Sequence, residues 1–235
     1  MSETKPKAKG HLHPITQVLL EIIPVFKELG FEIAEGPEIE TEFYNFDSLN
    51  IPKDHPGRDM QDTFWLKPEN LRKLMRTQTS AVQTRFMEAN KPPLRAVVPG
   101  RVYRSEATDA THEAQFTQFE ALVVDRKVSL ADLKGTLEAL FKSFLGKEAE
   151  VRFRPSYFPF VEPALEVDVK WGNKWLEVLG SGLVHPNVFK AVGIDPNEWQ
   201  GYAFAFGLDR LAMLKYGVED IRRFYTNDIR FLNQF

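Results

Sequence analysis

Segments typical of β-strands dominate the middle and the second half of the chain, and they restrict the fold more than any other feature. Apolar residues alternate with charged ones over 165–171, and Gly172-Asn173 then turns the chain into a second such segment, as in a hairpin. Comparable segments lie at 96–98, 102–104, 115–124, 151–154, 174–179 and 202–206. Because strands and helices do not alternate strictly along the chain, we predict an α+β fold with a mainly antiparallel sheet flanked by helices.

The helices predicted from apolar spacing are few and well separated. A long one begins near Ile15 and ends before Gly30, and Pro24 is expected to kink it. Ser129 and Asp132 have the spacing of a capping box at the start of another helix. We expect helices over 15–29, 80–89, 129–145 and 207–214.

The composition excludes several classes of protein. The chain has no Cys, which rules out disulfides, thiolate zinc sites, iron–sulfur clusters and a Cys nucleophile. Hydrophobic residues make up 43% of the 235 residues, which is too many for a disordered chain. No segment approaches the ~20 apolar residues of a membrane span, and the polar first seven residues do not form a secretory signal. We therefore expect a cytoplasmic protein.

The charge of the chain is nearly balanced. The formal net charge of −3 gives no global electrostatic reason to expect binding to a nucleic acid. If RNA is a partner, a local patch of the chain or another subunit must hold it.

A cluster of polar and aromatic residues is expected where two neighbouring strands pair. Strand alternation predicts that Arg104 and Glu106 share one face, and that Phe116, Gln118 and Glu120 share one face of the next strand. An Arg aimed at a phosphate or carboxylate, beside carboxylates that accept from an ammonium or an adenine amine, would explain this set. A solvated strand face has a similar composition and is the competing interpretation.

Small residues occupy alternate positions between Gly201 and Gly207, with aromatic residues between them. A strand face this flat lets a planar ligand approach the backbone closely. Arg210 follows in the first turn of the next helix, where backbone N–H groups attract phosphates. Tight sheet packing followed by a surface Arg would give the same pattern, so this alternative stays open.

Two aromatic residues, Phe158 and Phe160, point the same way by strand alternation. They either belong to the core or wall an aromatic pocket. Glu162, which follows them, fits a cap, a surface residue or a metal ligand. His112 lies in a polar loop, where it either donates to a phosphate or is a plain surface residue.

Together these patterns resemble the three signature motifs of class II aminoacyl-tRNA synthetases. Gly36-Pro37 after a long helix is similar to motif 1. Arg104-Ser105-Glu106 with Phe116 is similar to motif 2, and the small-residue strand ending in Arg210 is similar to motif 3. From about residue 11 to 235 the chain resembles the alpha subunits of bacterial phenylalanyl-tRNA synthetases, most closely at 11–14, 50–52, 59–65, 108–113, 157–163 and 184–186.

This resemblance implies the class II synthetase catalytic fold and a phenylalanine–tRNA ligase, which forms Phe-AMP from ATP and transfers phenylalanine to tRNA(Phe). It implies a catalytic domain over 11–235 after a flexible segment 1–10, with the N-terminal coiled coil of the family absent. The implied partners are a beta subunit in an α2β2 heterotetramer, tRNA(Phe) and L-phenylalanine, with no membrane. A stand-alone paralogue that makes an aminoacyl adenylate for another acceptor, and a non-catalytic amino-acid-binding paralogue, stay open as alternatives.

The resemblance also implies ATP-binding and catalytic roles. Arg104 would hold the α-phosphate of ATP and the substrate carboxylate. Glu106 would bind the adenine amine, and Phe116 would stack on the adenine ring. His112 and Arg210 would hold the outer phosphates, so Arg104, His112 and Arg210 are the implied catalytic residues.

For phenylalanine, the resemblance implies one set of contacts to the ammonium group and another to the ring. The ammonium group would lie near Gln118 and Glu120, with Ser80 and Trp65 also around it. Phe158 and Phe160 would wall the ring, and the small side chain of Ala203 leaves room for it. The full implied set is Trp65, Gln78, Ser80, Gln83, Gln118, Glu120, Phe158, Phe160, Val161, Ala203 and Ala205.

The resemblance implies Mg²⁺ as a cofactor. At some positions this chain has a residue other than the usual one of the family. Glu162 matches a Mg²⁺ ligand of the family that is shared with the beta subunit, and Glu177 is a second candidate ligand. Gln78 replaces a usual His, and its amide can still accept from an ammonium group. Ala205 replaces a usual Gly and is expected to crowd the ligand, and Ser181 replaces a frequent Cys.

Overall fold

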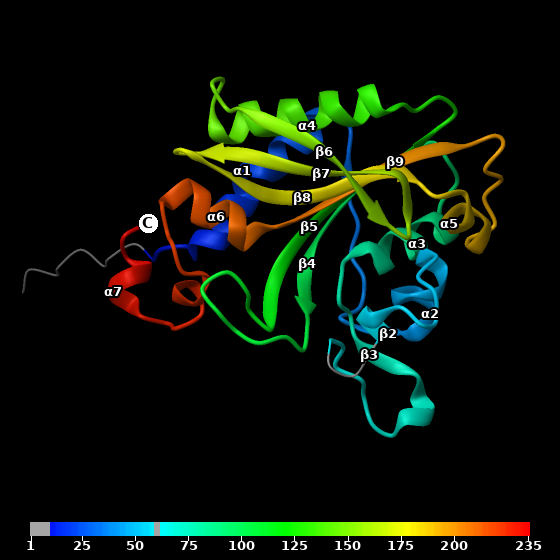
Figure 1. The fold of residues 1–235 in the computed structure, drawn as a ribbon, viewed down its shortest axis with the longest axis horizontal. Helices are drawn as coiled ribbons and strands as arrows, with labels where there is room; N and C mark the ends of the chain where they lie inside the picture. The colour runs from blue at the N-terminus through cyan, green and yellow to red at the C-terminus, as the bar shows by residue number, and fades with distance from the viewer. Residues whose placement is uncertain (1–9, 59–61) are drawn as a thin grey trace, which may run out of the picture.

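The protein is described over residues 10–58 and 62–235 by a computed structural model. Except for Gly10, the segment predicted to be flexible lies outside the described residues, and so do residues 59–61 of the family-like run 59–65. Figure 1 shows one large twisted sheet with helices on both sides of it.

The main sheet of the described residues has seven strands, in the order β1-β4-β5-β9-β8-β7-β6. β1 is parallel to β4, and the other neighbouring pairs of this sheet are antiparallel. The prediction of an α+β fold with a mainly antiparallel sheet is therefore confirmed. The strands are β1 (Glu32–Ile33), β4 (Leu94–Tyr103), β5 (Gln115–Asp125), β6 (Val151–Phe158), β7 (Val161–Trp171), β8 (Lys174–Val184) and β9 (Gln200–Gly207).

The pairing of β4 with β5 ends at Tyr103 and Gln115. One further hydrogen bond, from the backbone N of Arg104 to the O of Ala114 at 2.9 Å, closes this end. Arg104 and Glu106 therefore lie in the loop after β4, and the prediction that they belong to the strand is wrong, although both still line the same cavity as Phe116, Gln118 and Glu120. Beyond the last ladder bond the chain no longer follows the pleat, so the loop sets the direction of both side chains.

In the described chain, α1 (Pro14–Glu28), α4 (Leu130–Leu145) and α6 (Leu208–Tyr216) cover one face of the sheet (Figure 1). Their apolar stripes pack against inward-facing side chains of the central strands, such as Phe119 of β5 and Phe204 of β9. This packing forms the main hydrophobic core. Because side chains alternate along a strand, the neighbours of these core residues point to the opposite face.

The ends of the helices follow local signals in the sequence. The side chain of His13 caps the start of α1, and the helix continues through Pro24. Gly30 follows with φ +80°, a conformation that Gly adopts at little cost. Ser129 and Asp132 form the predicted capping box of α4. No helix of the described residues has the length and apolar character needed to cross a membrane.

The opposite face of the sheet is only partly covered. α3 (Ser80–Ala89) and α5 (Pro186–Ala191) pack over one end of it, against residues such as Leu122, Val124 and Ala203. The rest of this face stays open to a ligand.

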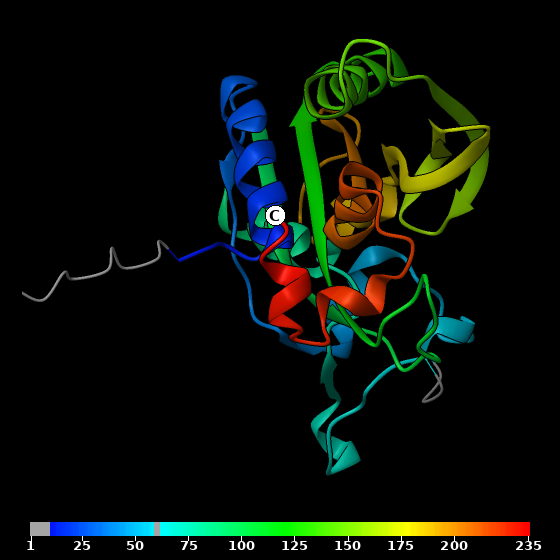
Figure 2. The same cartoon turned by 90° about the vertical axis from the view of Figure 1, so that its left-hand side faces the viewer.

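The remaining elements are short. β2 (Ile39–Thr41) and β3 (Lys73–Met75) form a separate antiparallel pair beside α3. Figure 2 shows the C-terminal elements next to the start of α1. The short helical segments are α2 (Glu42–Asn45), η1 (Asp47–Leu49), η2 (Pro56–Arg58), η3 (Glu69–Leu71), η4 (Ile221–Phe224) and α7 (Ile229–Leu232).

Candidate active site

An open cavity of about 690 Å³ lies on the partly covered face of the sheet. It collects side chains from β5, β8 and β9, from the loop after β4, and from the first turns of α3 and α6. Trp65, Gln83 and Glu162 are not among the residues that line it. The predicted site residues that do line it are Gln78, Ser80, Arg104, Glu106, His112, Phe116, Gln118, Glu120, Phe158, Phe160, Val161, Glu177, Ala203, Ala205 and Arg210.

Two guanidinium groups, those of Arg104 and Arg210, mark a cationic end of the cavity. Nε of Arg104 donates to the carbonyl O of Thr77 at 3.2 Å, and Nη1 of Arg210 donates to the carbonyl O of Glu177 at 3.1 Å. Cζ of Arg104 lies 5.0 Å from the ring centroid of Phe116. Burial lowers the pKa of Arg104; the carboxylate of Glu106 opposes this shift, and repulsion from the positive charge of Arg210 adds to it. An anion placed between the two groups would relieve this repulsion.

The loop between β4 and β5 carries His112 at the edge of the cavity. Oδ1 of Asp109 accepts hydrogen bonds from the backbone N of Thr111 at 2.7 Å and of His112 at 2.8 Å. These bonds hold the pKa of Asp109 well below its usual range. Asp109 also lies 3.0 Å from Nδ1 of His112. Nε2 is therefore the ring nitrogen that this contact leaves for a ligand.

Glu120 is a buried carboxylate surrounded by donors at the middle of the cavity floor. Its oxygens accept from Oγ of Ser80 at 2.6 Å, from Nε2 of Gln83 at 2.6 Å and from Oγ1 of Thr79 at 2.8 Å. Oε1 of Gln118 accepts from the backbone N of Thr79 at 2.8 Å. Burial raises the pKa of Glu120 to about 7. Gln83 thus contacts Glu120 without lining the cavity.

The far end of the cavity is apolar. The rings of Phe158 and Phe160 are stacked, with centroids 5.9 Å apart and planes 17° from parallel. A Cβ added at Gly180 would lie 2.9 Å from the ring of Phe158, so only Gly lets this ring lie against the sheet. Val161 and Ala203, both buried, complete this end. The space suits a small hydrophobic or aromatic group.

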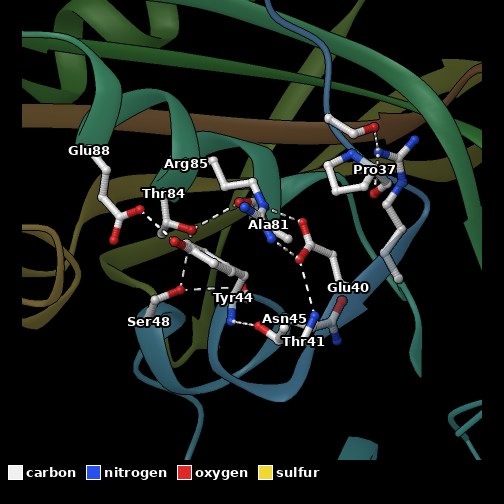
Figure 3. A network of polar contacts seen from close by, with 12 residues as sticks. Pro37, Glu40, Thr41, Tyr44, Asn45, Ser48, Ala81, Thr84, Arg85 and Glu88 are labelled. Carbon is white, nitrogen blue, oxygen red and sulfur yellow. Dashed lines mark hydrogen bonds and ion pairs between the residues drawn. The ribbon is translucent and has the colours of Figure 1, made fainter. Parts of the chain in front are cut away.

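A buried ion pair holds α3 from its outer side (Figure 3). Nε and Nη2 of Arg85 each donate to the carboxylate of the fully buried Glu40 at 2.7 Å. The guanidinium of Arg85 lies 3.7 Å from the ring centroid of Tyr44, whose OH donates to Glu88 at 2.7 Å. Because α3 begins at Ser80, these contacts fix the donors that surround the buried carboxylate on the cavity floor.

Gln78 and Trp65 contact a neighbouring segment. Nε2 of Gln78 donates to the carbonyl O of Asn45 at 3.2 Å, and Gln78 lines the cavity. The Trp65 ring packs against Phe46 with centroids 6.1 Å apart, and its Nε1 donates to the O of Arg58 at 3.2 Å. Phe46 lines the cavity in front of Trp65. The indole is therefore one layer behind the predicted contact with an ammonium group.

The two predicted metal ligands do not meet. Glu177 lines the cavity and pairs in register with Asp168 of β7. Glu162 is six residues away along β7, roughly 20 Å at the rise of a strand. Its side chain is 76% exposed and lies 3.5 Å from His185. At this separation the two carboxylates cannot bind one ion together, because ligands of one Mg²⁺ lie about 2 Å from it. The described residues contain no group of three or more acidic, His or Cys side chains suited to a metal.

Several residues of the site were not predicted from the sequence. Thr79 donates to both polar side chains of the cavity floor, and Phe46 forms part of the wall. No local pattern marks either residue, since their roles depend on how α2 and α3 pack. Gly180 and Gly182 follow the small-residue alternation that marks β9, and that signal could have identified the flat surface of β8.

Comparison with known proteins agrees with this geometry. The family described as "tRNA synthetases class II core domain (F)" matches residues 1–235. The phenylalanine–tRNA ligase alpha subunit of Bacillus subtilis is 53% identical over 244 residues, which cover 98% of this chain and 70% of that protein. The alpha subunit from Caldanaerobacter subterraneus subsp. tengcongensis is 52% identical over 98% of this chain and 71% of its own length.

A solved structure shares the fold at low sequence identity. Pyrrolysyl-tRNA synthetase from Desulfitobacterium hafniense superposes with a TM-score of 0.72 over 93% of this chain and 75% of that chain, at 20% identity. The fold is therefore that of class II synthetases. With half of its residues shared with the curated relatives, the chain belongs to the phenylalanine–tRNA ligase alpha subunit family of class II aminoacyl-tRNA synthetases.

Proposed function

We propose that the chain is the catalytic alpha subunit that activates L-phenylalanine with ATP and transfers it to tRNA(Phe). The observation that carries this proposal is the order of groups along one cavity. A cationic end with Arg104 and Arg210 is followed by the carboxylate of Glu120 and then by the rings of Phe158 and Phe160. This order matches the phosphates of ATP, the ammonium group of an amino acid and an aromatic side chain.

The first step forms a mixed anhydride. A carboxylate oxygen of phenylalanine attacks the α-phosphorus of ATP, and the bond from that phosphorus to the bridging oxygen of pyrophosphate breaks. Negative charge builds up on the α-phosphate as this happens, and Arg104 stabilises it. Phe116, 5.0 Å from the Arg104 guanidinium, would stack on adenine, and Glu106 would accept from its amine. Arg210 and His112 would hold the outer phosphates.

The second step needs no nucleophile from the protein. A ribose hydroxyl at the end of the tRNA attacks the carbonyl carbon of Phe-AMP, and AMP leaves. The chain contributes by holding both reactants in line, which is the main source of rate in such a transfer. The ring of phenylalanine would lie against Phe158 and Phe160, with Val161, Ala203 and Ala205 around it. Its ammonium group would lie at Glu120 and Gln118, beside Ser80 and Gln78.

Class II synthetases use ATP and Mg²⁺, and the cavity fits the ion with one carboxylate. Glu177 lines the cavity next to the Arg210 contact, and its side chain is 54% exposed. A single carboxylate suits Mg²⁺, which keeps water and phosphate oxygens as its other ligands. When bound there, the ion would neutralise phosphate charge during adenylate formation. Glu162 would bind an ion only in a separate site with ligands from elsewhere.

We further propose that residues 11–235 form the catalytic domain, that the protein works in the cytoplasm, and that a beta subunit completes an α2β2 assembly. The relatives at 50–53% identity are named as alpha subunits, which implies a partner subunit. The formal net charge of −3 agrees with such an assembly, because the partner subunit would supply most of the positive charge that binds tRNA.

Phenylalanine-dependent exchange between ATP and pyrophosphate tests the proposal. It is measured for the chain alone and with a beta subunit, and is followed by charging of tRNA(Phe). Exchange in neither condition would contradict the proposal, and exchange without charging would favour an adenylate-forming paralogue. Arg104→Ala is expected to lower exchange on the order of 10²–10³-fold. Arg101→Ala, at an exposed position on β4, is the matched control and should leave exchange unchanged.

A further inference from the structure

Asp209 is a buried carboxylate that takes part in neither step of the proposed reaction. It is 1% exposed and precedes Arg210 in the first turn of α6. Its Oδ2 accepts from the backbone N of Thr117 at 2.8 Å, and its Oδ1 accepts from the OH of Tyr225. A buried carboxylate with both oxygens bonded holds its partners firmly, because an unbonded one would cost several kcal/mol.

The bond to Thr117 continues the sheet beyond its backbone pairing. The ladder between β5 and β9 ends where Gln118 pairs with Gly207, because the chain turns into α6 at Leu208. The backbone N of Thr117 lies past this end and would lack an acceptor. Asp209 supplies the acceptor from the helix. A side chain of α6 thus replaces the missing strand partner.

This bond lies directly between two groups of the cationic end of the cavity. Thr117 follows Phe116 on β5, and Asp209 precedes Arg210 on α6. A Cβ added at Gly207 would lie 4.0 Å from both Cδ2 of Phe116 and Cβ of Arg210. The two side chains therefore flank Gly207, and the bond from strand to helix sets their separation.

Tyr225 brings the C-terminal part of the chain into the same arrangement. It follows η4, whose Ile221 donates its backbone N to the O of Ala110 in the β4–β5 loop at 2.9 Å. The O of Phe224 lies 2.9 Å from Nε2 of His13 at the start of α1. Figure 2 shows the C-terminal segment packed beside that end of α1. The contacts of Ile221 and Phe224 therefore fix the position of Tyr225, and its OH in turn holds the rotamer of Asp209.

We propose that Tyr225 and Asp209 are positioning residues for the nucleotide: Asp209 lines the cavity, but both its oxygens are bonded to the protein, so the pair sets the distance between Phe116 and Arg210. This inference rests on the proposed function, which places adenine and phosphates at those two residues. The amino-acid end is held separately, by donors of α3 around the carboxylate of the cavity floor. Loss of the Tyr225 hydroxyl therefore weakens ATP binding and leaves phenylalanine binding unchanged.

The test uses Tyr225→Phe in the full chain, with Tyr216→Phe as the matched control. The ring of Tyr216 packs against Phe235, and its OH forms no hydrogen bond with the residues that the structure describes. Calorimetry measures the Kd of ATP, and exchange with the beta subunit present gives separate KM values for ATP and phenylalanine. We expect Tyr225→Phe to raise the Kd and KM for ATP about tenfold, as for one lost hydrogen bond to a charged group. The KM for phenylalanine should stay within about twofold.

Two substitutions of Asp209 distinguish a positioning role from a general loss of folding. Asp209→Asn keeps an acceptor for Thr117 and should retain most of the ATP affinity, whereas Asp209→Ala should lose more than Tyr225→Phe. Unchanged ATP binding in Tyr225→Phe, or an equal rise of both KM values, would overturn the inference. If the wild-type chain shows no exchange, the proposed function is refuted but the inference is not, because ATP calorimetry still tests it. A wild-type chain that does not bind ATP would overturn both.

Discussion

Replacing Glu120 with Gln removes the one charge on the cavity floor whose pKa is raised to about 7. The substitution keeps the size of the side chain, but its single amide oxygen can replace only one of the two carboxylate oxygens, which accept from Ser80 and from Thr79. It also leaves the ammonium group of the amino acid opposite a neutral amide. A hydrogen bond to a charged group contributes about 1.5–3 kcal/mol, so the KM for phenylalanine should rise roughly 10- to 150-fold. The KM for ATP should not change.

The same substitution has a consequence for stability whose sign follows from the direction of the pKa shift. Glu120 titrates near its ordinary value of 4.5 in the unfolded chain and at about 7 in the folded chain. Below pH 4.5 both states are protonated, and the free energy of unfolding is highest with respect to this group. Between pH 4.5 and 7 only the unfolded chain ionises, so stability falls as pH rises through this window. The shift corresponds to about 3 kcal/mol.

Urea unfolding of wild type and Glu120→Gln at pH values from 4.5 to 8 measures this difference. The wild-type free energy of unfolding should fall relative to the variant as pH rises, and level off above pH 7. In the exchange assay, kcat/KM for phenylalanine should fall up to tenfold per pH unit below 7 in wild type only. Glu138→Gln, at an exposed position of α4, is the control for removing a carboxylate. Parallel pH profiles for wild type and Glu120→Gln would refute the reasoning.

Two other substitutions test the packing around the cavity. Ala203→Gly enlarges the apolar end of the cavity and should admit para-substituted phenylalanines in the exchange assay; unchanged discrimination would contradict the pocket assignment. Gly100→Ala should lower the free energy of unfolding by about 3–6 kcal/mol, because the new Cβ would lie 2.2 Å from Nη2 of the buried Arg76 and disturb its bonds to backbone carbonyls. Gly135→Ala, with nothing within 4 Å in α4, should instead stabilise by ~0.5–1 kcal/mol, and equal melting temperatures for the two variants would contradict this account.

Local patterns predicted much of this architecture because the forces behind them act over a few residues. The capping box at Ser129, the helix over 80–89 and the hairpin at Gly172 depend on neighbours in sequence, and the structure contains all three. Alternation in β5 likewise placed Gln118 and Glu120 on the cavity face.

The side-chain positions that the sequence did not predict lie where the regular pairing of the strands ends, or depend on contacts between distant segments. Arg104 and Glu106 lie beyond the last paired residues of the β4–β5 ladder, so the alternation of a strand does not by itself fix their directions. Glu162 lies beside an irregular stretch of the β7–β8 register, and its exposed side chain does not line the cavity. Tyr225 joins the site from 16 residues beyond its partner Asp209, through a contact that no motif encodes.

The two ends of the cavity are supported by separate parts of the chain. α3, held by Arg85 and the buried Glu40, fixes the amino-acid end, whereas Tyr225 fixes the nucleotide end from the C-terminal side. The two sets of hydrogen bonds have no partner in common. In a double-mutant cycle, the effects of Tyr225→Phe and Glu120→Gln on kcat/KM should therefore add to within about 0.5 kcal/mol. A coupling energy above ~1 kcal/mol would show instead that the strand β5, which carries both Thr117 and Glu120, transmits strain between the two ends.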